Sequence, residues 1–351
     1  MCGITGLCFG PGKDRTEEDY STIRKEFTQL LVNCQVRGRD AAGAFVVNKG
    51  PGNIYYYKAP KTAAHLTKDA KFLALLDQIG PDTIAVIGHT RAATTGSPRD
   101  NANNHPIIDG PIIGVHNGVI RNHWELGGLY SKVAKVDSAA IMALLRDCSM
   151  EKPLTTEDLV DRLPELEGSY AIAVADARKP NKIFLARNNN PICMTRNYKL
   201  GYLAFASTGE ILRATFGEEI RTFLMPAHSV CRIDRDCMKK RITFYPIIDD
   251  EEEWTAIPFK VVKEGRPLIR HRVRCMICHY DQYQETMKHD CPGPSVKSIP
   301  AVTQTKMDFP KATFKPSVCD KGRKCGIHGK KNCHELNHPL VRRMRIIRRK
   351  R

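Results

Sequence analysis

The sequence predicts an α+β protein in which stacked sheets are covered by helices, followed by a small, basic, Cys/His-rich C-terminal region. Strand-like segments crowd together between residues 169 and 233, while helical patterns come in two batches, which argues against a regular βαβ series. The charge is divided unevenly. Residues 1–259 carry 32 Lys and Arg against 31 Asp and Glu, whereas residues 260–351 carry 23 against 7. The two parts therefore have different physical roles, and only the second is suited to polyanions.

The first elements are a strand and a long helix. Residues 2–9 read as a buried strand. Thr16, followed by three acidic residues, resembles a capping box, and apolar residues then recur at helical spacing as far as Cys34. Gly38 is expected to close this helix.

Two strands and a second helix follow. Residues 42–47 and 53–58 are rich in apolar and aromatic residues and flank a Lys-Gly-Pro-Gly turn, which predicts a pair of strands. Residues 67–79 have helical spacing, and we expect Thr67 to be the N-cap.

The remaining elements alternate less regularly. Residues 83–89 and 112–116 are short apolar runs, typical of strands buried on both faces, and helical patterns return at 137–148 and 156–163. Further strands are expected at 169–176, 182–187, 192–196, 202–207 and about 222–233.

The pattern changes after Tyr245. The acidic run at 249–253 leads into a segment without periodicity, and Pro and Gly recur through 292–316. The sequence therefore predicts a domain over 2–245, a linker over 246–270 and a tail over 271–351. It shows neither a signal-peptide pattern nor an apolar run of about 20 residues, so we expect a cytoplasmic protein that does not contact membranes. The 13 cysteines then point to metal binding, catalysis or burial rather than disulfides.

Cys2 is the first candidate for chemistry. Removal of Met1 would give Cys2 a free α-amine, which titrates near ~7.7–8.0 and can act as general base for its own thiol. The alternative is a small buried residue at the start of a strand, because Cys is among the most buried residue types. Position alone favours that alternative.

Five segments in order change this balance. They are Cys2-Gly3-Ile4-Thr5-Gly6, Arg37-Gly38-Arg39-Asp40-Ala41-Ala42-Gly43, Gly88-His89-Thr90-Arg91-Ala92-Ala93-Thr94, His116-Asn117-Gly118 and Val136-Asp137-Ser138. Together they resemble the glutaminase domain of class II glutamine amidotransferases, most closely that of glucosamine-fructose-6-phosphate aminotransferase, with amidophosphoribosyltransferase a weaker likeness. The resemblance covers about 2–245 and implies a four-layer αββα sandwich of the N-terminal nucleophile hydrolase type.

The resemblance also implies catalytic roles. Cys2 would attack the side-chain amide of glutamine and form a thioester with release of ammonia. The Asn117 side chain and the Gly118 backbone N–H would form the oxyanion hole, where each donor contributes roughly 2.7–4 kcal/mol. No cofactor is implied for this reaction. By itself, Asn117-Gly118 could equally be a turn.

Substrate-binding roles follow in the same way. Arg91 would bind the α-carboxylate of glutamine, Asp137 its α-ammonium group, and Thr94 would lie in the same pocket, with Arg37 close to the nucleophile. Alternatives exist for the first two, since Arg91 could be a surface cation and Asp137 could cap the helix that begins at Ser138. His89 and His116 are expected to be core residues or to support the site.

Departures from the family limit what the resemblance implies. Ala92 replaces a usual Trp and Thr95 a frequent His in a loop that closes over glutamine, so closure and coupling to an acceptor differ, while Ala41 replaces a Ser. The sequence lacks sugar-phosphate isomerase domains and the acidic-pair phosphoribosyl-binding motif. The ammonia acceptor, a substrate or a partner protein that binds it, is therefore not identified.

The tail holds six Cys and six His within 271–351. Cys275, Cys278, His289 and Cys291 form a plausible tetrahedral zinc set, and zinc would stabilise a segment that is too polar to fold alone. The alternative is a tail with unbound thiols. The terminal RRMRIIRRKR predicts nucleic-acid binding through phosphate contacts, with an acidic protein partner or plain solubility as alternatives.

The sequence thus predicts a glutaminase that passes ammonia to an unidentified acceptor. Two alternatives stay open: an amide hydrolase of the same class that acts without transfer, and an inactive derivative that binds zinc and nucleic acid.

Overall fold

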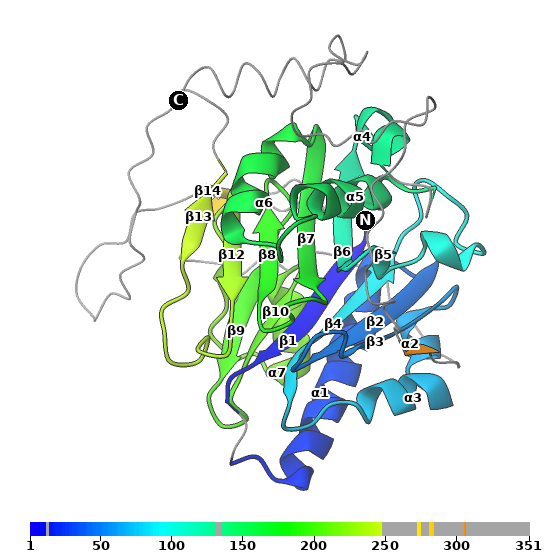
Figure 1. Ribbon diagram of the computed structural model, residues 1–351. Coiled ribbons are helices and arrows are strands. Elements are labelled where there is room, and N and C mark those ends of the chain that lie inside the picture. Colours follow the sequence, from blue (N-terminus) through cyan, green and yellow to red (C-terminus); the bar gives the residue numbers. More distant parts are fainter. Residues whose placement is uncertain (12–13, 131–134, 248–271, 275–280, 284–304, 307–351) are drawn as a thin grey trace. The chain divides into compact units, whose positions relative to one another are not determined.

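The fold was examined in a computed structural model of the chain (Figure 1). The structure describes residues 1–11, 14–130, 135–247, 272–274, 281–283 and 305–306. All of these fall within one compact unit, Met1–Asp308, and the second unit, Phe309–Arg351, lies outside the described residues.

The larger sheet is antiparallel and has β1 and β4 near its centre. Its strand order is β11-β9-β10-β1-β4-β2-β3-β16. In chain order the strands are β1 (Gly3–Phe9), β2 (Ala41–Asn48), β3 (Ile54–Ala59), β4 (Thr83–Arg91), β9 (Cys193–Asn197), β10 (Tyr202–Ala206), β11 (Phe223–Leu224) and β16 (Thr305–Lys306). Gly3 pairs with Thr90 and Ala41 with Arg91, so the start of β1 and the end of β4 lie together.

The smaller sheet is also antiparallel, with the order β13-β12-β8-β7-β6-β5. Its strands are β5 (Ile107–Asp109), β6 (Ile112–Ile120), β7 (Gly168–Asp176), β8 (Ile183–Arg187), β12 (Ser229–Ile233) and β13 (Phe244–Pro246). Because β5 pairs with Ile112–Gly114, the second half of β6 is paired, within the part of the chain that the structure describes, with β7 alone. In addition, β14 (Arg272–Arg274) pairs antiparallel with β15 (Asp281–Tyr283).

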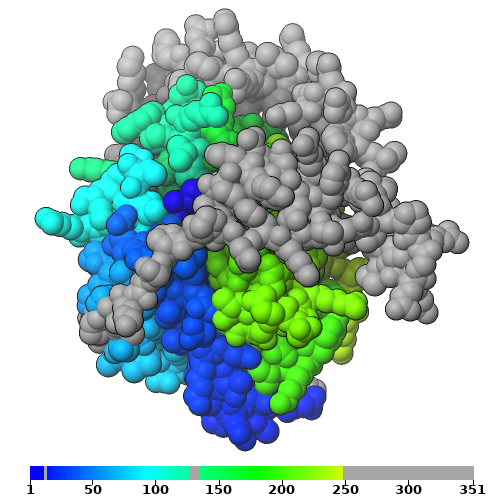
Figure 2. All heavy atoms as spheres, turned by 180° about the vertical axis from the view of Figure 1, so that it is seen from behind, coloured from blue at the N-terminus to red at the C-terminus, as the bar shows by residue number. Residues whose placement is uncertain are grey.

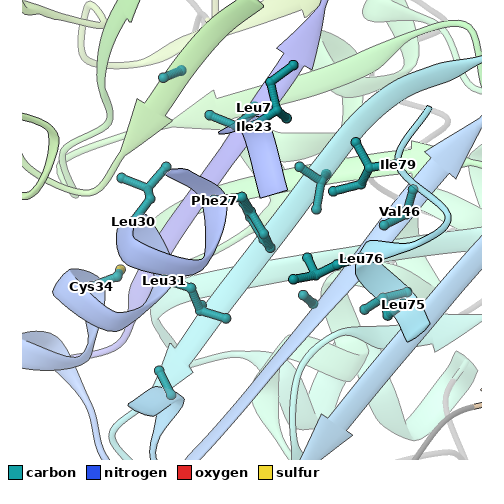
Figure 3. Close-up of a cluster of buried hydrophobic side chains, with 14 of the residues drawn as sticks. Leu7, Ile23, Phe27, Leu30, Leu31, Cys34, Val46, Leu75, Leu76 and Ile79 are labelled. Atoms are coloured by element: carbon teal, nitrogen blue, oxygen red, sulfur yellow. The ribbon is translucent and has the colours of Figure 1, made fainter. Parts of the chain in front are cut away.

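One group of helices covers the larger sheet: α1 (Glu17–Cys34), α2 (Ala63–Leu66), α3 (Ala70–Leu76) and α7 (Gly209–Phe216). The Thr16 hydroxyl accepts from Asp19 N–H, and the Asp19 carboxylate accepts from Thr16 N–H, as in the predicted capping box. Such a cap is worth about 1 kcal/mol. Figure 3 shows Phe27 and Leu31 of α1 pointing toward the sheet, where they are fully buried.

The other helices, α4 (His123–Tyr130), α5 (Asp137–Cys148) and α6 (Thr156–Arg162), lie on the side of the smaller sheet (Figure 1). Leu144 and Leu145 of α5 are buried with Ile172 and Val174 of β7 in a second core. Short 3-10 helices occupy Gln35–Arg37, Asn101–Asn103 and Leu163–Glu165. The protein thus has a mixed α/β fold with antiparallel sheets, each carrying its own helices.

Most sequence-based elements are confirmed, and three details are wrong. The helix expected at 67–79 is the shorter α3 (Ala70–Leu76), which has Asp69 at its N-cap position, while Thr67 is the C-cap of α2. The strand expected at 222–233 is two strands, β11 and β12. Gly38 does not close α1, which ends at Cys34 with Gln35 as its C-cap; Gly38 instead follows the short 3-10 helix Gln35–Arg37. A Cβ on Gly38 would lie 2.3 Å from the Arg91 carbonyl carbon, so this glycine permits β4 to approach.

Two further observations concern the composition-based predictions. None of the helices in the described part of the chain is both long and apolar enough to cross a bilayer. The seven cysteines among those residues are all free. The proposed zinc ligands Cys275, Cys278, His289 and Cys291 lie outside the described residues.

Candidate active site

Four elements from both sheets meet at one pocket of about 260 Å³. They are the start of β1, the end of β4, the second half of β6 and the first turn of α5 (Figure 1). The beginning of the chain reaches the molecular surface there, and its dark blue atoms are visible in Figure 2. The pocket is lined by Cys2, Arg91, Ala92, Thr94, Thr95, His105, His116, Gly118, Val136, Asp137 and Ser138. Five of the seven predicted glutaminase residues are therefore brought together.

Cys2 sits at the mouth of this pocket, immediately before β1. Its thiol donates to the Ala92 carbonyl oxygen over 3.4 Å. Burial raises the pKa of the Cys2 thiol above its ordinary value, so the group is held as a neutral thiol and needs a base before it can attack. Met1 is 51% exposed and therefore accessible to removal. Removal would create the α-amine next to the thiol.

Arg37 does not line the pocket, contrary to its predicted place among the substrate-binding residues. Its Nε donates to the Cys2 carbonyl oxygen over 2.8 Å, and one terminal nitrogen lies 3.7 Å from the Met1 sulfur. Arg37 is only 6% exposed. It therefore holds the backbone of Cys2, and it lies close to Cys2 as the sequence predicted.

Asn117 and Gly118 follow each other in β6, on the half of the strand that pairs with β7 and not with β5. Gly118 lines the pocket and has a φ of +149°, and a Cβ there would lie 1.9 Å from the Ser169 carbonyl oxygen. Only glycine fits this position. The Asn117 side chain is fully buried, and neither its Nδ2 nor its Oδ1 has a hydrogen-bond partner. A buried amide left without partners is costly unless a ligand engages it. The alternative of a simple turn is wrong, since both residues lie within a strand.

Arg91 ends β4 and is almost completely buried. Its terminal nitrogens donate to the side-chain oxygen of Asn104 (2.8 Å) and to the carbonyl oxygens of Thr95 (2.5 Å) and Gly96 (2.7 Å). All three acceptors are neutral. Among the described residues no carboxylate pairs with this buried guanidinium, which favours an anionic ligand in the pocket it lines. The alternative of a surface cation is wrong.

Asp137 is the first residue of α5 and is 6% exposed. Its carboxylate accepts from the backbone N–H groups of Ile120 (2.9 Å) and Ser138 (3.0 Å). The N-cap position belongs to Val136, which provides no side-chain cap, so Asp137 satisfies one helical N–H from inside the helix. Because it also lines the pocket, support of the helix and binding of a cation are compatible.

The loop after β4 completes one side of the pocket, and its predicted residue Thr94 is exposed there. Side chains hold this loop in place. The Asp40 carboxylate accepts from Ala93 N–H over 2.7 Å, and Asn104 Nδ2 donates to the Pro98 carbonyl over 2.8 Å. Lys58 Nζ donates to the carbonyls of Asn104 (2.6 Å) and Pro106 (2.9 Å), and burial lowers its pKa to about 8.

Three buried histidines lie at the pocket: His105 and His116 line it, and His89 contacts both. His89 and His105 stack with ring centroids 3.9 Å apart, and His89 Nε2 contacts the His116 carbonyl oxygen at 2.9 Å. Burial lowers the pKa of all three below the ordinary value, to about 3 for His89. His89 and His116 were expected to be core or supporting residues, and the structure places them there. Over the described residues, no cluster of His, Cys, Asp and Glu could hold a metal.

Four residues around this pocket were missed in the sequence: Lys58, Asn104, His105 and Asn190. Asn104 and His105 stand in a polar run before Pro106, and Asn190 ends a run of three asparagines before Pro191. Such runs indicate irregular backbone, but not what the side chains contact.

Comparison with known proteins identifies the kind of domain that contains this pocket. Residues 89–214 match the family described as glutamine amidotransferase domain. The chain therefore carries a glutamine amidotransferase domain, related to the class II enzymes.

Individual relatives agree with this class. The chain is 30% identical to 7-cyano-7-deazaguanine synthase of Sulfolobus acidocaldarius over 244 residues, which are 67% of this chain and 48% of that protein. It is 32% identical to the isomerizing glutamine–fructose-6-phosphate aminotransferase of Staphylococcus aureus over 199 residues, 55% of this chain and 30% of that protein. The chain thus spans about half the length of the 7-cyano-7-deazaguanine synthases that it matches.

Among solved structures, the glutamine phosphoribosylpyrophosphate amidotransferase of B. subtilis is similar, with a TM-score of 0.51 and 16% identity. The similarity covers 70% of this chain and 49% of that one. At this level of identity it supports the fold alone.

Proposed function

We propose that this chain hydrolyses glutamine to glutamate and ammonia through Cys2, as the glutaminase part of an amidotransferase. On this proposal the two helix-covered sheets form the αββα sandwich of the N-terminal nucleophile type. The observation that carries it is the convergence of Cys2, Arg91, Gly118 and Asp137 on one pocket. These four come from widely separated parts of the sequence, and each supplies one chemical requirement of the reaction.

The first half of the reaction forms a thioester. The α-amine of Cys2, freed by removal of Met1, takes the thiol proton while Sγ attacks the side-chain amide carbon of glutamine. The resulting oxyanion would accept from Gly118 N–H and Asn117 Nδ2, which has no other partner. The amine then returns its proton to the leaving nitrogen, the C–N bond breaks, and ammonia departs.

The second half hydrolyses the thioester. A water molecule gives a proton to the α-amine and attacks the thioester carbon, and the same donors stabilise the second oxyanion. The C–S bond breaks, the sulfur regains its proton and glutamate is released. No cofactor takes part in these steps.

Selection of glutamine requires one cation and one anion in the pocket. Arg91 would bind the α-carboxylate and Asp137 the α-ammonium, both from buried positions where charge-assisted hydrogen bonds are strong. Thr94, from the loop, would add a hydroxyl near the same groups.

The ammonia acceptor is a separate question. The matched relatives are named for two different reactions, a 7-cyano-7-deazaguanine synthesis and an amination of fructose-6-phosphate. The acceptor is therefore determined outside the shared domain, and we propose that a partner protein or a segment beyond this domain binds it. A zinc-stabilised tail that contacts nucleic acid stays a prediction for residues 271–351.

The test uses the full chain. Intact mass should show that Met1 is removed, and the purified protein should release glutamate and ammonia from glutamine. Cys2→Ala should reduce this activity to background. Cys148→Ala is the matched control, because Cys148 is a half-buried cysteine that does not line the pocket.

Retention of Met1 in an active protein, or full activity of Cys2→Ala, would sink the proposal. An uncleaved N-terminal extension should likewise abolish activity, and its proteolytic removal to expose Cys2 should restore it. Faster hydrolysis of another γ-glutamyl amide than of glutamine would favour a hydrolase without transfer.

A further inference from the structure

The peptide that joins Asn117 to Gly118 is held from its rear side by a residue outside the pocket. In the register of β6 and β7, Gly118 lies opposite Tyr170. Tyr170 N–H donates to Asn188 Oδ1 over 2.7 Å, and Tyr170 C=O accepts from Asn188 N–H over 3.1 Å. The backbone groups of Tyr170 therefore point away from β6. In an antiparallel ladder, the opposite residue of such a pair also points away, so Gly118 N–H faces the open edge of β6.

The carbonyl of the same peptide points the other way. Because the peptide is planar and trans, the Asn117 C=O and the Gly118 N–H lie on opposite sides of the strand. The Asn117 carbonyl oxygen accepts from Asn190 Nδ2 over 2.8 Å. Fixing this carbonyl fixes the direction of Gly118 N–H, and a hydrogen bond to the carbonyl also polarises that N–H group.

Asn190 is itself firmly placed. It follows β8 in the segment Asn188-Asn189-Asn190 and is 3% exposed. Asn188 Nδ2 donates to the Gly168 carbonyl, and Arg187 donates to the carbonyls of Asn189 (2.9 Å) and Met225 (2.6 Å). The turn is therefore held at both ends. Asn190 does not line the pocket, so it acts on the substrate only through the peptide.

We propose that Asn190 is a positioning residue that aligns the Gly118 N–H with the oxyanion of the reaction. The inference rests on the proposed function, because it presupposes an oxyanion at this position. Asn117 lies opposite Ala171, so the pairing with β7 also holds this carbonyl. Loss of Asn190 would leave that strand contact alone and let the Asn117–Gly118 peptide tilt, which Gly118 permits more easily than any other residue. Glutamine would still bind, because Arg91 and Asp137 are unaffected.

The test compares Asn190→Ala and the isosteric Asn190→Asp with the wild type and Cys2→Ala. We expect kcat for glutamine hydrolysis to fall about tenfold or more in both variants, with KM changed less than about threefold, since the loss of an oxyanion donor costs about 10²–10³ in kcat and misalignment costs part of that. Asn190→Asp should be at least as slow, because it places a carboxylate against a carbonyl oxygen. The Kd of glutamine, measured by calorimetry in the Cys2→Ala background, should change little.

Asn189→Ala, at the exposed neighbour, is the matched control and should retain wild-type kinetics. A kcat within twofold of wild type in both Asn190 variants overturns the inference, as does a parallel rise of the glutamine Kd. An inactive wild-type protein would overturn the proposed function together with this inference. An active wild-type protein with unchanged Asn190 variants would overturn the inference alone.

Discussion

The two walls of the pocket are built by different means. One wall consists of sheet backbone, with Cys2 at the start of β1 and Gly118 within β6, and it is fixed by strand pairing. Asn117 precedes Gly118 in β6, but its buried side chain is not among the groups that line the pocket. The other wall is the loop from Ala92 to Asn104, which is held mainly by hydrogen bonds between side chains and loop carbonyls.

This difference separates two tasks. The sheet wall presents the groups that react or stabilise charge, and preorganised groups of this kind contribute most to the rate. The loop wall is held by Arg91, the last residue of β4, whose guanidinium donates to the loop carbonyls and also lines the pocket. Changes in the sheet wall should therefore act on kcat, and changes in the loop wall on KM.

The strongest test is Asn117→Ala on the sheet wall. We expect kcat to fall about 10²–10³-fold with little change in KM, because one oxyanion donor is lost. The free energy of unfolding should stay the same or rise, since the deleted amide has no hydrogen-bond partner in the folded chain. Steady-state kinetics and chemical denaturation measure both quantities.

The control is glutamine binding to Asn117→Ala in the Cys2→Ala background, which should match Cys2→Ala alone. A KM that rises as much as kcat falls would show that Asn117 acts in binding, and the contrast between the walls would then be lost.

The sheet wall was also the part that the sequence predicted best. Cys2, Gly118 and Asp137 lie in or beside elements with regular apolar periodicity, which the sequence predicts well. The order of their motifs along the chain then indicated that they meet at one pocket. Arg91 was found because it ends such a strand.

The loop wall and its supports were not predictable in the same way. Lys58 contacts the carbonyl of Asn104, and Asn190 contacts that of Asn117, across 46 and 73 positions of sequence. Such contacts have no periodic signature, because the acceptor is backbone that every residue possesses. The predicted start of the helix at 67–79 was wrong for a related reason. Thr67 is a good N-cap by type, yet here it closes the preceding turn.

On the loop wall, Arg91→Lys should raise KM for glutamine about 10–100-fold with a smaller change in kcat. Lysine keeps the charge but loses the planar fork, and a hydrogen bond to a charged group contributes about 1.5–3 kcal/mol. The measurement is steady-state kinetics, supported by glutamine titration in the Cys2→Ala background. A variant with normal KM and low kcat would show that Arg91 acts in the chemical step, as the groups of the sheet wall do, and not in binding.

A smaller effect on KM is expected at Lys58, which contacts the loop but does not line the pocket. Lys58→Met removes the ammonium group that holds the carbonyls of Asn104 and Pro106. The loop that carries Asn104 should loosen, and KM should rise about fivefold, which corresponds to roughly 1 kcal/mol. Lys61→Met, in the same segment, is the control and should leave KM at the wild-type value. Equal effects of the two substitutions would exclude a specific role of Lys58 in the loop.

The last prediction concerns the three buried histidines at the pocket. We expect their substitution to change activity at neutral pH least and to change stability in acid most clearly. Burial lowers the pKa of His89, His105 and His116 in the folded chain, and for His105 the neighbouring His89, His116, Lys58 and Arg91 lower it further. The unfolded chain binds these protons near pH 6.5. Between that pH and the lower folded pKa values, of which His89 has about 3, the unfolded state holds more protons, so stability falls as pH falls. Each histidine contributes up to about 1.4 kcal/mol per pH unit.

His105→Phe should reduce this slope by up to one histidine's share while keeping a ring stacked on His89. The free energy of unfolding, measured by denaturant titration from pH 7 to pH 5, provides the slope. His228→Asn removes an exposed histidine, at a φ of 49° that asparagine tolerates, and should leave the slope unchanged. If both variants keep the wild-type dependence of the unfolding free energy on pH, the acid sensitivity arises from other groups and the prediction is wrong. A weaker dependence in His105→Phe alone would show that the folded protein is most stable when this buried histidine is neutral.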